Sequence, residues 1–436
     1  MKLALVAALP PGGAPESGHA LRLAEALGAL GHEVHALAGV ESRELSVPGL
    51  TVHASMRDWT WRDLPRLAGF LRRTRPDALI LHYVGWAYGA HPMVTLAPGL
   101  ARALGRGTRT ATCLTSWGGA SLRAWLRPAG RPGRGVPRGL ETGSGAAGAA
   151  PAPAPVPAPG TGQRPPRLLR ALSFGRLDAR FGTIFSASDR IVVLSEAHRA
   201  VFAAYEPRAA GKLAVVPPGP AIRLAPAPDP DARRRSREGL GAAPEDFLLV
   251  YLGFVYPGKG LETLLRAMKE LAVSESRSRL VLAGGVHPTA GAAHLASLRA
   301  LADELGVAGR VTWTGGFDWD SPAPSEWLRA ADACVLPFDA GLQLNNSSFA
   351  AAAAHELPVI STRGAGTEPA FADGENVRLC PPRDPGALAA AVRELANDAE
   401  LRGRLGRGAL DLAAKRLSWR AIAGQFMELL GRPARP

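Results

Sequence analysis

The sequence predicts an α/β protein of two domains, each built around a parallel β-sheet. Short apolar runs, typical of buried strands, alternate with amphipathic helical patterns in both halves of the chain. This strand and helix order is typical of parallel sheets. A proline-rich stretch separates the two series. With 436 residues, 47% of them hydrophobic, the chain is long enough to bury two cores.

The first series is expected to form a domain over residues 1–220. The apolar start of the chain resembles a short secretion signal, but Pro10 and Pro11 interrupt the run and a helical pattern over 17–30 follows at once. We therefore interpret the start as a buried strand. The expected strands of this domain lie at residues 3–9, 33–37, 78–82, 110–115, 190–195 and 213–219.

Residues 127–167 interrupt this first domain with a stretch of Pro, Ala, Gly and Arg. Such a composition cannot bury enough apolar surface to order itself, so we expect a disordered or polyproline-like insertion. Arginines flank and punctuate it, whereas Glu141 is its one acidic residue. Contact with an acidic membrane or glycan is one interpretation, and a solvated loop is the favoured one.

The second series is expected to form a domain over 221–416, after a proline-rich and basic linker near 220–245. A final amphipathic segment, 417–436, is predicted to form a helix. Open α/β sheets bind ligands beyond the carboxyl ends of their strands, so the active site should lie in a cleft between the domains. The expected strands begin at Phe247 and continue at 280–283, 311–314, 333–336 and 359–361.

Composition excludes several classes of protein. No apolar run approaches the roughly 20 residues that span a bilayer. The three cysteines lie far apart, which favours neither a disulfide framework nor a zinc site and fits a reducing cytoplasm. The net charge of +13 comes without aromatic residues interleaved in a basic stripe, so we expect no nucleic-acid partner. Peripheral contact with an anionic membrane stays open.

One loop stands out as a candidate phosphate site. At 251–260 a buried strand ends in a glycine-rich turn that carries Gly258, Lys259 and Gly260 and opens an amphipathic helix. Backbone N–H groups at a helix N-terminus attract anions, and a lysine adds charge. The alternative is an ordinary strand-to-helix loop with a solvated lysine.

Several short motifs occur in a characteristic order. They are Pro11-Gly12-Gly13, Gly31-His32-Glu33-Val34, Gly258-Lys259-Gly260, the stretch ending in Gly284-Gly285, the stretch ending in Gly315, 331–337 and 357–362. In this order the sequence resembles the retaining glycosyltransferases of the family-four type, over most of its length outside the insertion. The resemblance implies the GT-B fold, with two Rossmann-like domains facing each other across a cleft and the final helix, 417–436, packing back across both domains. It also implies a nucleotide-diphosphate sugar as donor substrate, with no cofactor and no metal.

The sequence departs from that family at three positions. Phe254 replaces the usual arginine, and Gln343 and Ala351 replace the usual acidic pair. Hydrogen bonds to charged groups contribute about 1.5–3 kcal/mol each, so these losses require compensation or weaken donor binding severely. Polar residues before an alanine-rich helix are candidates for compensation, although capping of that helix explains them equally well. They are Gln343, Asn345, Asn346, Ser347 and Ser348.

Further candidates carry weaker patterns. Gly12 and Gly13 let the backbone approach a sugar or phosphate, as a tight turn also would. Glu16 is a candidate acceptor contact or only a helix start. His82, near the end of a predicted strand, is a candidate polar residue of the cleft, although a structural strand-end histidine is the favoured interpretation. Gly315 ends a motif of the donor domain, and Glu368 binds a donor hydroxyl or caps local structure.

Three functions follow from these residues. The leading hypothesis is a glycosyltransferase in which Lys259 neutralises the departing diphosphate, acting on an unknown glycan, lipid or small-molecule acceptor. A sugar-nucleotide epimerase of the same fold is an alternative, but it needs an acid–base pair that the sequence does not offer. A non-catalytic partner protein that has lost the acidic pair is the third.

Overall fold

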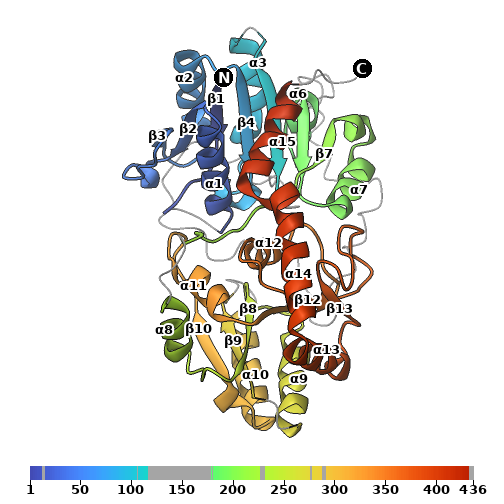
Figure 1. Cartoon of the computed structure of the whole chain (residues 1–436). Helices are drawn as coiled ribbons and strands as arrows, with labels where there is room; N and C mark the ends of the chain where they lie inside the picture. Colours follow the sequence, from blue (N-terminus) through green and yellow to red (C-terminus); the bar gives the residue numbers. More distant parts are fainter. Residues whose placement is uncertain are drawn as a thin grey trace. The chain divides into compact units, whose positions relative to one another are not determined.

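The computed structural model describes the chain as two compact units (Figure 1). The described residues are 1–11, 15–105, 107–115, 178, 180–225, 231–274, 277–286 and 291–431. The first unit extends to Pro217 and also includes the C-terminal segment from Trp419. The second unit extends from Pro218 to Ser418. The predicted insertion at 127–167 and the predicted glycines Gly12 and Gly13 lie outside the described residues. The predicted cleft between the domains stays a prediction.

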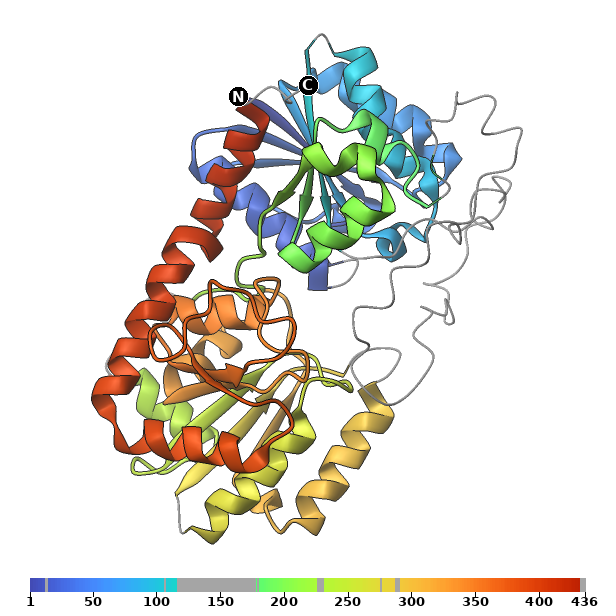
Figure 2. The same ribbon diagram turned by 90° about the vertical axis from the view of Figure 1, so that its right-hand side faces the viewer.

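The first domain is built on a seven-stranded, fully parallel sheet in the order β3-β2-β1-β4-β5-β6-β7. Its central strands are apolar on both faces because helices cover both faces of the sheet (Figures 1 and 2). The strands are β1 (Lys2–Val6), β2 (Glu33–Gly39), β3 (Leu50–Met56), β4 (Ala78–Tyr83), β5 (Arg109–Leu114), β6 (Arg190–Val193) and β7 (Leu213–Val215).

Helices and short 3-10 turns connect these strands. The α-helices are α1 (Pro15–Ala29), α2 (Leu64–Thr74), α3 (Ala97–Leu104), α6 (Ile184–Ala187), α7 (Glu196–Tyr205) and α15 (Trp419–Gly431). The 3-10 turns are η1 (Val40–Ser42), η2 (Trp61–Asp63), η3 (Gly85–Tyr88), η4 (Pro92–Leu96) and η5 (Pro207–Lys212).

The second domain repeats this design with a six-stranded parallel sheet in the order β10-β9-β8-β11-β12-β13. The strands are β8 (Phe247–Leu252), β9 (Ser278–Ala283), β10 (Val311–Gly315), β11 (Ala333–Leu336), β12 (Val359–Thr362) and β13 (Arg378–Cys380). The helices are α8 (Ala232–Gly239), α9 (Leu261–Val273), α10 (Gly291–Glu304), η6 (Ala308–Arg310), α11 (Ala323–Ala330), α12 (Ser347–Ala354), α13 (Pro385–Asn397), α14 (Ala399–Leu412) and a π-helical turn (Ala413–Leu417).

The predicted linker differs from the structure. Residues 232–239 form α8, and Arg237 of this helix is 7% exposed and pairs with Asp332 at 3.0 Å. Ile222 and Leu240 join the apolar core of the second domain. The basic stretch is therefore part of the folded second domain, because a buried arginine that is paired and bonded to carbonyl oxygens can tether a polar helix.

The final helix, α15, belongs to the first domain, where it packs against α1 and β5. Ile422 and Phe426 are buried, and the Arg109 side chain of β5 donates a hydrogen bond to the carbonyl oxygen of Leu430 at 3.0 Å. An arginine at the C-terminus of a helix complements the helix dipole. Among the described residues no helix is long and apolar enough to cross a membrane.

Candidate active site

The loop after β8 is fixed by its own packing. The buried Tyr251 hydroxyl donates a hydrogen bond to the carbonyl oxygen of Phe254 at 2.9 Å, and burial raises the pKa of this tyrosine. Gly260 has φ +71°, and a Cβ atom there would lie 1.8 Å from the carbonyl oxygen of Pro337. Only glycine allows this approach. The loop therefore packs backbone to backbone against the carboxyl end of β11.

Lys259 is held between two aromatic rings. Its Nζ atom lies 4.7 Å from the ring centroid of Tyr256 and 4.7 Å from that of Phe338. The side chain is half-buried, and the described part of the chain offers it no carboxylate within ion-pairing distance. A lysine over aromatic faces keeps its full positive charge available to an anion.

Two helices begin at the loop that carries this lysine. The first intrahelical acceptor of α9 is the carbonyl oxygen of Gly260, so the N–H groups of the first turn have no partner within the helix. At α12, Asn346 is the N-cap, and its Oδ1 atom accepts from the backbone N–H of Phe349 at 2.9 Å. The Oγ atom of Ser348 lies 3.3 Å from where a Cβ on Gly253 would sit. The start of α12 thus abuts the loop after β8.

The structure brings most of the predicted donor-side residues to one edge of the second sheet. Gly258 accepts from the N–H of Asp339 at 3.2 Å, which joins the β8 and β11 loops. The amide nitrogen of Gln343 packs against Gly366, near the place a Cβ would take. Asn345 lies in the turn before α12, Ser347 opens that helix, and Gly315 ends β10. Glu368 lies in the loop after β12 and is 7% exposed.

Asn346 resolves the two interpretations of the polar loop in part. Its side chain caps α12, as the capping interpretation requires. Ser347 and Ser348 sit in the first turn, where backbone N–H groups point out of the helix. Phosphate contact by this loop, including Gln343 and Asn345, stays a prediction.

The departures from the family pattern have local explanations. Ala351 is fully buried inside α12, where a carboxylate would face the apolar core of this domain. The ring of Phe254 reaches within 4.0 Å of where a Cβ on Gly285 would sit, so it leans toward the loop after β9. Ala351 therefore fits an apolar core, whereas Phe254 is half-exposed.

His82, a candidate polar residue of the cleft, lies near the end of β4 in the first domain, and that role stays a prediction. This side chain is 1% exposed, and its Nε2 atom shares a hydrogen bond with Nδ1 of His19 at 2.9 Å. The His19 ring in turn lies 4.9 Å from that of Trp419. Burial lowers the pKa of His19 to about 4 and holds the pKa of His82 well below its usual value. The favoured interpretation, a structural histidine, fits these contacts, because α1 and α15 cover the end of β4.

Glu16 lies in the first turn of α1, and its side chain is outside the described part of the structure. Its predicted contact with an acceptor stays a prediction. Across the described ranges no group of three or more His, Cys, Asp or Glu side chains could hold a metal ion.

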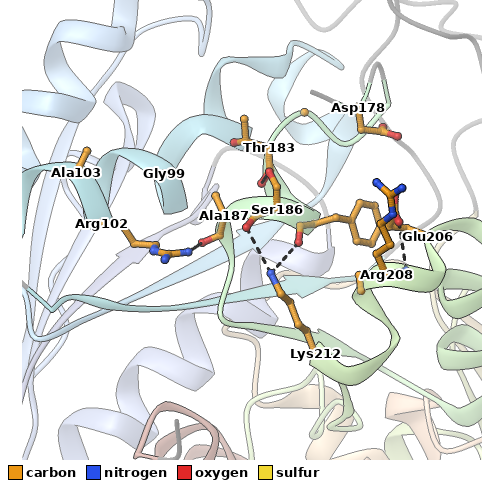
Figure 3. Close-up of a pocket in the computed structure, with 13 residues that line it drawn as sticks. Gly99, Arg102, Ala103, Asp178, Thr183, Ser186, Ala187, Glu206, Arg208 and Lys212 are labelled. Atoms are coloured by element: carbon orange, nitrogen blue, oxygen red, sulfur yellow. Dashed lines mark hydrogen bonds between the residues drawn. The ribbon is translucent and has the colours of Figure 1, made fainter. Parts of the chain in front are cut away.

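A cavity of about 1030 Å³ opens elsewhere on the first domain (Figure 3). It lies where α6 and η5 precede β6 and β7, which is the amino edge of the sheet. The Nζ atom of Lys212 donates to the carbonyl oxygens of Phe185 at 3.0 Å and of Ser186 at 3.4 Å (Figure 3). It also donates to that of Ser188 at 3.0 Å, so this lysine already caps α6. We do not assign catalysis to this cavity, because parallel sheets bind ligands at the opposite edge.

Sequence reasoning missed Tyr256 and Phe338. Tyr256 is part of the glycine-rich loop that the sequence analysis singled out, but no sequence pattern indicated that its ring contacts Lys259. Phe338 follows Pro337 at the end of β11, far from the loop in sequence. An aromatic residue directly after the Leu336-Pro337 pair is the signal that could have suggested it.

Comparison with known proteins shows similarity to glycosyltransferases, mainly over part of the chain. Residues 246–398 match the model of the family described as Glycosyl transferases group 1. The GDP-mannose-dependent alpha-(1-6)-phosphatidylinositol monomannoside mannosyltransferase of Mycolicibacterium smegmatis is 32% identical over 254 residues, which are 56% of this chain and 62% of that protein. The D-inositol 3-phosphate glycosyltransferase 2 of Catenulispora acidiphila is 33% identical over 210 residues, or 47% of each chain. The chain thus spans about half to three-fifths of these relatives' length.

Solved structures share the two-domain fold over almost the whole chain. HepE of Anabaena, in complex with UDP and glucose, superposes with a TM-score of 0.65 at 16% identity and covers 99% of both chains. WaaG, a glycosyltransferase involved in lipopolysaccharide biosynthesis, gives 0.58 at 16% identity over 98% of this chain and 99% of its own. The predicted GT-B fold class, two α/β domains on parallel sheets, is confirmed. Residues 246–398 are thus similar to the group 1 glycosyltransferases, and the solved structures share the fold of the two domains.

Proposed function

We propose that the chain transfers a sugar from a nucleotide-diphosphate donor to an acceptor hydroxyl, with retention of anomeric configuration. The observation that carries this proposal is the position of Lys259. Lys259 precedes α9 in the loop after β8, within the part of the chain that matches the group 1 glycosyltransferases, and the same loop abuts the start of α12 at Gly253. Helix N-termini and a lysine are groups that attract a diphosphate, which supports this proposal.

In this reaction the bond between the anomeric carbon and the diphosphate oxygen breaks, and a bond to the acceptor oxygen forms. Negative charge develops on the departing nucleoside diphosphate, and the acceptor hydroxyl loses its proton. Hydrogen-bond donors and cations that already face this charge lower the barrier, because they need not reorganise during the reaction. Lys259 and the N–H groups of the first turns of α9 and α12 would supply them. We propose that no metal ion or cofactor takes part.

Thermal stability against UDP, GDP, ADP and TDP tests the donor site. A ligand at 100 times its dissociation constant stabilises the folded protein by roughly 2.7 kcal/mol, which should raise the melting temperature by about 2–4 °C. Lys259→Ala should abolish the shift. Lys269→Ala is the matched control, because Lys269 is an exposed lysine on the same helix, two turns away from its start.

A selective shift that Lys259→Ala removes and Lys269→Ala keeps would support the donor site and name the base. No shift with any diphosphate at millimolar concentration would favour a non-catalytic protein. Donor sugars for a transfer assay follow from the relatives and the solved structures. We propose GDP-mannose and UDP-glucose as first donors, with and without EDTA to test metal independence.

The acceptor and the location are proposals of the same kind. The named relatives suggest an inositol phosphate or a phosphatidylinositol mannoside as first acceptors to test.

We further propose a cytoplasmic protein that contacts the inner face of an anionic membrane, because the net charge is +13. Flotation with anionic and neutral vesicles tests this, and equal recovery with both would contradict it.

A further inference from the structure

We infer that Tyr256 and Phe338 are positioning residues that hold the ammonium group of Lys259 in place for a nucleoside diphosphate. This inference rests on the proposed function. A lysine side chain has four rotatable bonds and loses much conformational freedom when an anion immobilises it. In this structure the Nζ atom is already placed 4.7 Å from the centroids of both rings. Diphosphate binding would then cost less conformational entropy of the Lys259 side chain.

Two rings suit this purpose better than a carboxylate. An acidic neighbour would also fix the lysine, but it would cancel the charge that the diphosphate needs and compete with it. An aromatic face attracts a cation through its quadrupole and leaves the net charge unchanged. Lys2 illustrates the other arrangement, because its Nζ atom pairs with Glu33 at 3.1 Å.

Phe338 is itself held firmly, which a positioning residue requires. Its carbonyl oxygen accepts hydrogen bonds from the Thr362 hydroxyl and from the N–H of Gly341. The next residue, Asp339, donates its N–H to Gly258 at 3.2 Å, and its carboxylate pairs with Arg383 at 3.1 Å. The ring is 7% exposed. Phe338 therefore stays in place when the Lys259 side chain moves.

A second cation–aromatic contact in the same domain gives a matched control. The guanidinium carbon of Arg402 lies 5.7 Å from the ring centroid of Phe247, at the amino end of β8. That arginine also donates to the carbonyl oxygen of Ala396 at 3.1 Å. Phe247→Leu removes a ring from a cation without touching the carboxyl edge of the sheet.

Two measurements on the full chain test the inference. The first is the 13C NMR signal of reductively methylated Lys259, which two ring faces should shift upfield without any ligand. The chain has only five lysines, so Lys259→Arg assigns the signal. The second is the dissociation constant for UDP and GDP. We expect Tyr256→Leu and Phe338→Leu each to remove part of the upfield shift and to weaken diphosphate binding about fivefold.

Tyr256→Phe keeps the ring and should restore most of the shift and of the binding, whereas Phe247→Leu should change neither. An unshifted Lys259 signal in the parent protein would overturn the inference. Leu variants that lose the shift but bind diphosphate like the parent would overturn it while the proposed function stands. A parent that binds neither diphosphate would overturn the proposed function and this inference together.

Discussion

The carboxyl edge of the second sheet presents a half-buried lysine between two aromatic rings, whereas near the same edge of the first sheet His82 is buried. Both residues follow or end an apolar strand, and both looked like candidates for chemistry. Lys259 sits on a glycine loop that packs through backbone atoms and leaves its side chain at the surface. His82 sits within β4, where α1 and α15 cover it. A polar side chain becomes available for chemistry when a loop carries it past the covering helices.

The largest expected effect tests the backbone packing of the lysine loop. Gly260→Ala adds a Cβ atom 1.8 Å from the oxygen of Pro337 at a residue with φ +71°. We expect the free energy of unfolding to fall by about 4 kcal/mol, because positive φ and a backbone clash add together. Urea denaturation measures this loss.

Gly315→Ala is the control for that change. Gly315 has a similar φ of +73°, but nothing lies within 4 Å of where its Cβ would sit. Only the conformational cost applies, about 1 kcal/mol. Equal losses for the two variants would contradict the close approach at Pro337.

The next effect tests the sealed histidines of the first domain. Burial lowers the pKa of His19 from 6.5 to about 4. Between those values the unfolded chain binds more protons than the folded chain, so stability falls as the pH decreases from about 6.5 to about 4. His19 alone should remove about 3 kcal/mol by pH 4. Melting temperatures across this range measure the loss.

The His19→Leu/His82→Leu double variant should flatten that pH dependence, because apolar groups replace both partners of the hydrogen bond. An unchanged slope would show that other groups carry the acid sensitivity. His355 of the second domain is one such group, since burial also lowers its pKa. The comparison would then become one between two buried sites of similar kind.

The smallest effect compares the same cap in the two domains. Asn346 caps α12 through Phe349 at 2.9 Å, and Ser195 caps α7 through His198 at 3.2 Å. Replacement of either by alanine should cost about 1 kcal/mol of stability. Asn346→Ala should also weaken diphosphate binding in a thermal-shift titration, whereas Ser195→Ala should leave it unchanged. Equal binding by both variants would remove α12 from the donor site.

Local sequence patterns predicted much of the fold, and the elements that were not predicted have weak local patterns. The buried central strands were predictable because both faces are apolar. The edge strand β3 was missed because it is half-exposed and mixes polar and apolar residues, and the edge strand β13 was missed because it has only three residues. Helix α8 was read as a linker because its apolar contacts come from Leu240 and the buried stem of Arg237.

The site was predictable only where neighbours in sequence make it. The glycine loop and Lys259 are contiguous, so their pattern was visible. The ring of Phe338 reaches Lys259 from another strand, and His19 reaches His82 from a helix 63 residues away. No local pattern predicts such contacts, because the register of the folded strands and helices creates them.

The return of α15 to the first domain has a consequence for biosynthesis. Domains generally fold as units while the ribosome is still working. Here the ribosome must complete every residue of the second domain before Trp419 emerges. Until then the nascent first domain keeps an uncovered apolar surface along α1 and β5, where Ile422 and Phe426 will later lie. A stalled or truncated chain that ends before α15 should therefore be a good client for chaperones, even though its second domain is whole.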